Sequence, residues 1–382
     1  MIYLLSLVMA LLPTYLIRFK IFNIPTTFLE LLIVVFLLAA CSQLNGESIK
    51  KIKNLGRLNW AVGLFVLSGI ISTIIGPEKT AALGQLKAFI LEPVLFFYAA
   101  VITVKSKEDL NIVLRWLFAS ASLVALFGLI QYVTLVHLPM RFWGYGAEVR
   151  RISSVFDYPN ALALFLAPLI GFFIALIVCD YKLLKITWIQ WLGLGLMGTA
   201  LILSGSRGAL MAVVITLIWL LILKSGFRKT LLVIVAIGSL LLFIPSIRDR
   251  ISLGLSDPSS MAHAELWQFS VIKISSTPIL GNGLAGFATL NQDVNYPHNI
   301  FLNFWLELGL LGLISFLAIC FFVLERYKKP ALSAGRHPSA LTFAAGIFMT
   351  ILILHGLVDV PYFKNDLSVL FWFMISLFYI QD

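Results

Sequence analysis

A tight turn in the middle of the chain carries an arginine that could bind an anion. The segment is Ser204-Gly205-Ser206-Arg207-Gly208, and it joins two apolar runs. Arg207 should stand at the start of a helix, where unpaired backbone amides also favour anions. An arginine at membrane depth is costly unless it is paired or hydrated, which favours an anionic partner. The alternative is an arginine whose guanidinium simply extends to the membrane surface.

A second segment, Tyr296-Pro297-His298-Asn299, places a histidine before a long apolar run. Histidine is the side chain best suited to accept a proton near neutral pH, so His298 is a candidate catalytic base. Asn299, Asn303 and Glu307 follow at i, i+4 and i+8 and form a polar stripe on one helix face. Such a stripe should face a hydrated cavity that binds substrate. The alternative for a lone histidine at a helix start is capping or packing.

Two further segments add cations and a second histidine. Arg150 and Arg151 lie at the edge of a loop, and their planar guanidinium groups could clamp phosphate oxygens. Anchoring at the membrane interface is the alternative for this pair. His263 shares a helical face with Trp267 and is a candidate for substrate binding, while the tryptophan is expected to be structural.

Other ionisable groups lie within apolar runs and are candidates for function or for bracing the bundle. They are Lys87 with Glu92, and His355 with Asp359 at i, i+4. The sequence contains no DxD, HExxH or paired-cysteine pattern. A metal site is therefore disfavoured, and no cofactor is expected.

The elements that position these groups are expected to be membrane-spanning helices. Hydrophobic residues make up 60% of the 382 and charged residues 12%, about half the charge of a soluble chain. A span needs about 20 mostly apolar residues. The sequence predicts an all-α polytopic membrane protein with about twelve transmembrane helices. The predicted spans are 2–17, 24–41, 60–75, 81–104, 111–137, 158–179, 186–204, 208–223, 229–245, 299–323, 340–360 and 365–380.

The chain is expected to form one transmembrane domain, 1–382, with a single large loop at 246–298. This loop is rich in Ser, Asp, Pro, Gly and Asn and is expected to carry turns and short helices. Apolar residues from Leu266 to Ile274 recur at near-helical spacing, which predicts an amphipathic helix on the membrane surface. A loop of this length is usually functional or disordered, and order is favoured here.

Loop charge predicts the orientation. With both termini in the cytoplasm, every inside loop is short and basic, and short loops are those that obey the positive-inside rule. The loop 246–298 and the candidate residues Arg150, Arg151, Arg207 and His298 then lie outside. The net charge of +10 is explained by inside loops meeting anionic membrane lipids, so nucleic acid is not needed as a partner.

Taken together, four motifs resemble the O-antigen ligase and polymerase superfamily. They are Arg-x-x-Ser-x-Phe-x-x-Pro-Asn-x-x-Ala (151–163), Ser-Gly-Ser-Arg-Gly (204–208), Trp267 followed by Pro278-x-x-Gly-x-Gly, and the His-Asn…Glu-x-Gly-x-x-Gly segment (298–312). The similarity in order and spacing covers roughly residues 85–375.

The resemblance implies a polytopic glycosyltransferase of the GT-C type in the bacterial cytoplasmic membrane. Such proteins transfer a glycan from undecaprenyl diphosphate to an acceptor hydroxyl outside that membrane, without a metal. The acceptor is lipid A–core in ligases and another lipid-linked repeat unit in polymerases. By this resemblance Arg207 contacts the diphosphate, and His298 activates the acceptor or steadies the leaving group.

One departure leaves ligase and polymerase equally open. The family commonly has an arginine four residues before the tryptophan of the large loop, where this chain has His263. Ser-Ser-x-x-His-x-x-x-Trp at 259–267 is instead similar to polymerase-like members. A rival from another class is a secondary transporter or lipid flippase, although no inverted repeats are evident.

Overall fold

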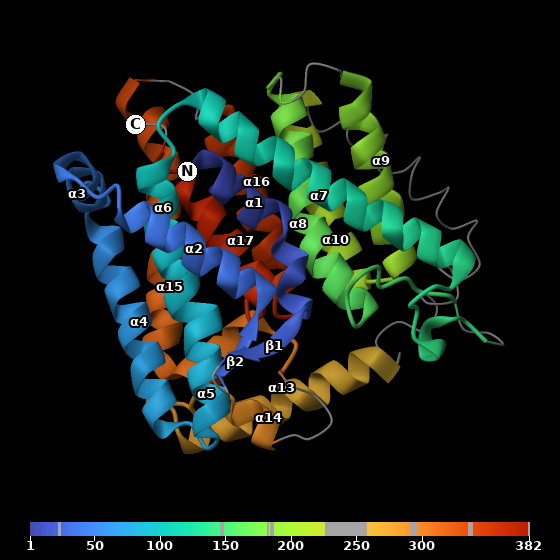
Figure 1. The fold of residues 1–382 in the computed structure, drawn as a ribbon. Helices are drawn as coiled ribbons and strands as arrows, with labels where there is room; N and C mark the ends of the chain where they lie inside the picture. The colour runs from blue at the N-terminus through green and yellow to red at the C-terminus, as the bar shows by residue number, and fades with distance from the viewer. Residues whose placement is uncertain are drawn as a thin grey trace.

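The computed structural model is helical apart from one short hairpin (Figure 1). It describes residues 1–21, 24–145, 149–181, 183, 187–225, 258–290, 296–334 and 339–380. The helices of the first half are α1 (Ile2–Ala10), α2 (Phe28–Cys41), α3 (Gly46–Lys53), α4 (Arg57–Ile75), α5 (Lys79–Gln85), α6 (Glu92–Thr103), α7 (Lys107–Thr134) and α8 (Pro159–Val178). Those of the second half are α9 (Thr187–Ser204), α10 (Arg207–Ser225), α13 (Pro258–Ser276), α14 (Gly286–Leu290), α15 (Ile300–Ala334), α16 (Ala340–Gly356) and α17 (Asn365–Ser376).

Five of these helical segments are long and apolar enough to cross a membrane, so the protein is an all-α polytopic membrane protein. They are Arg57–Ile75, Lys79–Thr103, Lys107–Thr134, Pro159–Val178 and Ile300–Tyr327. A sixth would be α2 with α3, which meet at 115°, and α9, α10 and α16 include shorter apolar helices. This is fewer than the twelve spans expected from hydropathy, and the run 229–245 lies outside the described residues.

The first predicted span is not a continuous α-helix. Residues 2–17 form α1 and a 3₁₀ turn (Leu12–Leu16), and an antiparallel hairpin follows, of β1 (Arg18–Ile21) and β2 (Ile24–Thr27). Pro13 in this segment favours the break because it lacks a backbone N–H. The hairpin leads directly into α2 through a capping box, in which Thr27 accepts from the Glu30 amide and Glu30 accepts from the Thr27 amide.

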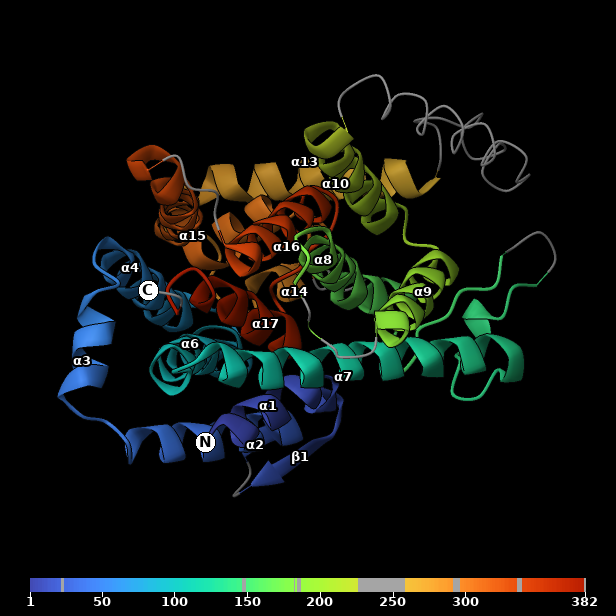
Figure 2. The same cartoon turned by 90° about the horizontal axis from the view of Figure 1, so that it is seen from above.

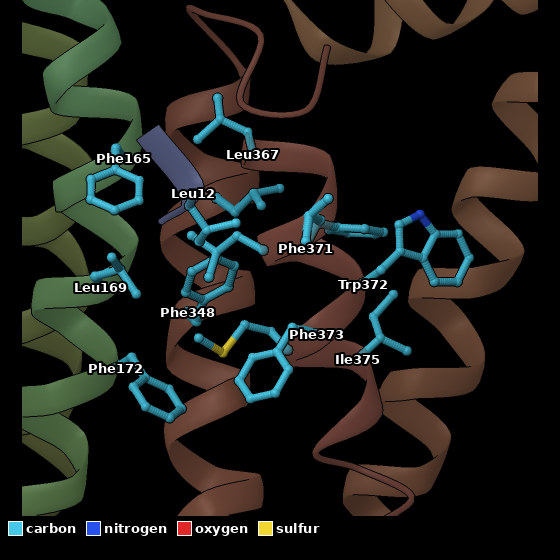
Figure 3. Packing of buried hydrophobic residues seen from close by; sticks show 14 of the residues in the cluster. Leu12, Phe165, Leu169, Phe172, Phe348, Leu367, Phe371, Trp372, Phe373 and Ile375 are labelled. Atoms are coloured by element: carbon cyan, nitrogen blue, oxygen red, sulfur yellow. The ribbon is translucent and has the colours of Figure 1, made fainter. Parts of the chain in front are cut away.

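Helix α8 forms the centre of the bundle and packs against α16, α9 and α10 (Figure 2). Its buried face carries Phe165, Leu169 and Phe172, which pack towards Phe348 and the residues of α17 (Figure 3). Close approach needs a glycine here, since a Cβ at Gly171 would lie 2.2 Å from the Ile351 Cδ1. The core therefore holds α8, α16 and α17 in fixed register.

The two ends of the bundle differ in the groups that they gather. At one end Met1, Lys51 and Lys105 line the same pocket, and the Arg326 guanidinium donates to the Phe378 carbonyl near the C-terminus. Groups that loop charge predicts to be cytoplasmic therefore share a face. Helices α13 and α14 lie across the opposite end (Figure 1).

The helix predicted in the large loop is present as α13. Its Ile274 is buried with Phe287 of α14 and Leu306 of α15, while Val271 and Ile272 are exposed. One apolar side thus packs on the bundle and another stays outside the protein, as an interfacial helix requires.

Helix α15 is broken where the loop that follows α13 packs against it. Gly309 has a φ of 68° inside this helix, and its added Cβ would lie 2.5 Å from the Ile279 carbonyl oxygen. The Asn282 amide donates to the Leu306 carbonyl, and the Leu310 amide donates to the Ile279 carbonyl. The two glycine motifs predicted at 278–283 and 309–312 thus meet in space.

Candidate functional site

His298 meets a carboxylate from a distant part of the chain. It precedes α15 with a left-handed φ of 51°, a conformation that costs free energy and clusters at functional sites. Its Nδ1 lies 3.2 Å from Oδ1 of Asp359, which is buried in the turn after α16. The same carboxylate oxygen accepts the Val360 amide at 2.9 Å. Because Asp359 fixes Nδ1 as the protonated nitrogen, Nε2 of His298 is left as the atom that can accept a proton.

The start of α10 packs against this histidine–aspartate pair. His355 Nε2 lies 4.0 Å from the second oxygen of Asp359. An added Cβ at Gly208 would lie 3.4 Å from the His355 ring and 2.5 Å from Val358. A larger residue here would have to displace the Val358 side chain, so glycine brings the first turn of α10, with Arg207, close to the loop that carries Asp359.

His263 from α13 completes a cluster of rings. Its ring centroid lies 5.2 Å from that of His298, and it stacks on Trp267. The Trp267 indole N–H points at the His298 carbonyl at 3.4 Å. Burial, followed by His298 and Arg207, lowers the pKa of His263 from its ordinary value. His263 is thus disfavoured as a second cation and suits the role of a neutral hydrogen-bonding group.

Arg151 supports the turn that carries Arg207. Its Nε donates to the Ser204 carbonyl at 2.8 Å and its Nη2 donates to Asn160 Oδ1 at 2.7 Å. Gly205 has a φ of 64° and packs on the Arg151 side chain. The two predicted motifs, 151–163 and 204–208, therefore contact each other in the folded protein.

Arg150 differs from the predicted phosphate clamp. Its Nε donates to the Trp143 carbonyl and its Nη1 to the Tyr132 carbonyl, while its guanidinium lies over the Tyr132 ring. These contacts engage two of its three nitrogens with backbone carbonyls, and the remaining N–H groups are the donors that a phosphate clamp would use. Arg150 braces the loop after α7, because the carbonyls at the end of that helix require donors.

The polar stripe also differs from its prediction. Asn299 caps α15, since its Oδ1 accepts the amides of Phe301 and Leu302. Asn303 and Glu307 are buried instead of facing a hydrated cavity. Glu307 accepts the Phe287 amide at 3.0 Å, and it lies about 13 Å along the helix from His298. Asn299 and Glu307 thus accept from the amides at the starts of α15 and α14, which need acceptors.

The sequence pattern indicated only a weak role for Asp359, as the i, i+4 partner of His355. The partner that the structure shows, His298, lies 61 residues earlier in the chain. The signal that could have found it is an acidic residue in an apolar segment placed at the same end of the bundle as His298. Among the described residues, no three His, Cys, Asp or Glu side chains are arranged to hold a metal ion.

We expect Gly205→Ala to destabilise the turn at 204–208 and to lower the activity of the protein. A side chain in the left-handed conformation costs about 1–2 kcal/mol, and the new Cβ would lie 3.0 Å from Arg151 Nε. Thermal unfolding in detergent should give a lower Tm. Gly195→Ala in α9 is the control, because nothing lies within 4 Å of its added Cβ. Equal Tm values for the two variants would contradict the prediction.

The fold and these side chains define a class of protein: a multi-pass membrane protein with a histidine–aspartate pair and an arginine-bearing helix start at one end of its bundle. The sequence profile described as O-antigen ligase matches residues 192–317, which include Arg207, His263 and His298. An O-antigen ligase of Pseudomonas aeruginosa strain PAO1 is 27% identical over 297 residues, which cover 71% of this chain and 66% of that relative. The resemblance seen in the sequence is thus confirmed: the chain is similar to the O-antigen ligase family over these residues.

Proposed function

We propose that this protein transfers a glycan from a polyprenyl diphosphate, such as undecaprenyl diphosphate, to an acceptor hydroxyl at the outer face of the bacterial cytoplasmic membrane. The observation that carries the proposal is the contact of His298 Nδ1 with Asp359 Oδ1, 3.2 Å long, beside the start of α10. A base and an anion-binding helix start are the two groups that this chemistry needs.

In the proposed reaction, Nε2 of His298 takes the proton of the acceptor hydroxyl. The hydroxyl oxygen forms a bond to the anomeric carbon of the donor sugar while the bond from that carbon to the diphosphate oxygen breaks. The polyprenyl diphosphate leaves with the bonding electron pair. Arg207 stabilises the developing charge, as arginine clamps do in other phosphate chemistry. Arg151 supports the turn and is close enough to Gly205 to add a second cation.

The remaining groups take supporting roles in this proposal. His263 hydrogen-bonds the substrate as a neutral ring, and Asp359 orients His298 and stabilises its protonated form. Tyr158 and Tyr296 share a hydrogen bond, and the Tyr296 ring lies 5.0 Å from that of His298, so they suit the edge of a sugar path. Both termini lie in the cytoplasm, which puts the cluster outside.

The acceptor is either lipid A–core, as in a ligase, or a second lipid-linked repeat unit, as in a polymerase. This chain has His263 where the family commonly has an arginine, and this feature keeps a polymerase activity open. An assay that offers each acceptor separately, with the same labelled donor, distinguishes the two by the size of the product.

The proposal is tested with purified protein in lipid nanodiscs, a labelled polyprenyl-diphosphate glycan and an acceptor. We expect a covalent product whose rate is unchanged by EDTA, because Arg207 supplies the positive charge that a metal would otherwise provide. Loss of product with chelator and its return with Mg²⁺ would contradict the metal-independent mechanism.

A flippase predicts a different outcome. In proteoliposomes it would carry the labelled donor across the bilayer with no covalent change to the glycan. Translocation without product in the complete reaction would contradict glycan transfer.

A further inference from the structure

A pocket with a mainly apolar lining and several charged side chains lies behind the β1–β2 hairpin. Its volume is about 330 Å³, near the lower end for ligand sites, so it suits a small group. The hairpin, the start of α2, the turn around Lys87 and the start of α17 form its walls. Three phenylalanines, Phe19, Phe89 and Phe363, line it together with charged and amide side chains.

The acidic group in this pocket is already neutralised. Glu30 Oε2 lies 2.9 Å from Lys87 Nζ, and Glu30 Oε1 accepts from Asn365 Nδ2 at 3.2 Å. Two other cations line the pocket, Arg18 and Lys364. Within the described part of the chain, neither of them has a carboxylate oxygen within 4.0 Å. The charged side chains that line the pocket are therefore three cations and one carboxylate.

Lys364 is held by aromatic rings. Its Nζ lies 4.9 Å from the ring centroid of Tyr158, 5.3 Å from that of Tyr15 and 5.4 Å from that of Phe156. Burial lowers the pKa of Lys364 from its ordinary value, while Asp366 and other nearby carboxylates oppose this effect. Rings stabilise an ammonium group less than a paired anion does, so an anionic ligand would complete its surroundings.

The pocket is joined to the histidine–aspartate pair through two tyrosines. Lys364 lies on the Tyr158 ring, the Tyr158 hydroxyl is hydrogen-bonded to Tyr296, and Tyr296 packs on His298. The proposed diphosphate clamp is built from other elements, the α9–α10 turn and Arg151. The pocket thus adjoins the base without using the groups that would hold the donor.

We propose that this pocket binds a negatively charged sugar unit, bearing a phosphate or a carboxylate, of the glycan acceptor. The assignment rests on the proposed transfer function. Arg18 and Lys364 contact the anionic group, and the phenylalanine rings pack on the sugar. The bound unit directs the neighbouring acceptor hydroxyl past Tyr158 and Tyr296 to Nε2 of His298.

The test measures acceptor binding separately from transfer. The full chain in neutral-lipid nanodiscs is titrated calorimetrically with three oligosaccharides: a phosphorylated core oligosaccharide, the same molecule after phosphatase, and a uronate-containing one. Lys364→Met and Arg18→Gln should each weaken binding of an anionic oligosaccharide about tenfold, as expected for one charge-assisted contact. Lys364→Arg should retain most of the affinity. Lys20→Met on the same hairpin is the control, since Lys20 does not line the pocket.

Several outcomes separate this proposal from the transfer function. Arg207→Ala should still bind the acceptor oligosaccharide, because it does not line the pocket. If the wild type transfers glycan while Lys364→Met binds all three oligosaccharides normally, the acceptor pocket is wrong and the transfer function stands. If the oligosaccharide binds through Lys364 but no product forms with a donor, the pocket stands and the transfer function is wrong. Equal affinity for all three oligosaccharides, or loss of binding when phosphatidylglycerol is added, would also overturn the pocket assignment.

Discussion

Replacing His298 with Ala should lower the rate of glycan transfer about 10²–10⁴-fold, the usual contribution of a general base. The variant keeps the donor clamp, so the rate constant should fall while donor binding persists. Single-turnover transfer in nanodiscs with saturating donor measures this effect. His137→Asn is the matched control, because His137 is an exposed histidine in the loop after α7, with a left-handed φ that asparagine tolerates.

The substitution Asp359→Asn tests the role of His298 as a base by changing the carboxylate that contacts it. The Asn amide can donate to Nδ1 of His298, which favours the tautomer with its proton on Nε2, and it cannot stabilise the imidazolium that forms. We expect most of the rate loss of His298→Ala, together with a changed pH profile. A merely structural Asp359 would instead lower the amount of folded protein and leave the pH profile of the remainder unchanged. Near-normal turnover in both variants would exclude His298 as the base.

Replacing Arg207 with Ala should lower the transfer rate about 10³-fold. Removal of one group that stabilises charge on a leaving phosphate or oxyanion costs 10²–10⁵ in rate. Arg207→Lys keeps the charge but loses the planar fork of donors, so its rate should be intermediate. The same labelled donor, followed to product in nanodiscs, gives the three rates.

Arg141→Ala controls for the general loss of a cation outside the membrane. Arg141 lies over the Phe142 ring in the loop that follows α7. It should transfer at the wild-type rate. If Arg207→Ala matched it, Arg207 would be only an interfacial anchor, which is the alternative that the sequence also allowed.

Local pattern was sufficient for the class of protein. Long apolar runs predicted α4, α7, α8 and the first part of α15 to within a few residues at most ends, because a lipid-spanning backbone must satisfy its hydrogen bonds within one helix. The same rule predicted more spans than the long apolar helices among the described residues. The apolar run at 2–17 is interrupted by Pro13, and hydropathy does not distinguish a continuous helix from a broken one.

Local pattern also predicted the chemistry at single positions. Arg207 in its glycine turn and His298 before α15 were singled out because their residue types are rare and costly in such places. Asn303 and Glu307 were predicted wrongly to face a cavity, because helical spacing says that they share a face but not what covers it. The backbone amide of Phe287, at the start of α14, donates to Glu307 on this helix face, and it lies 20 residues earlier in the chain.

Only the tertiary structure decided which groups act together. The packing of α8, α16 and α17 carries Asp359 to His298 and Gly208 to His355, across separations that no local pattern reports. It also brings Lys364 over the rings of Tyr15 and Tyr158 and opens a pocket beside them. The sequence alone determined that this is a membrane protein with an arginine and a histidine placed for anion and proton chemistry. The pairing of that histidine with a carboxylate depends on side-chain packing between distant helices, which hydropathy and spacing do not encode.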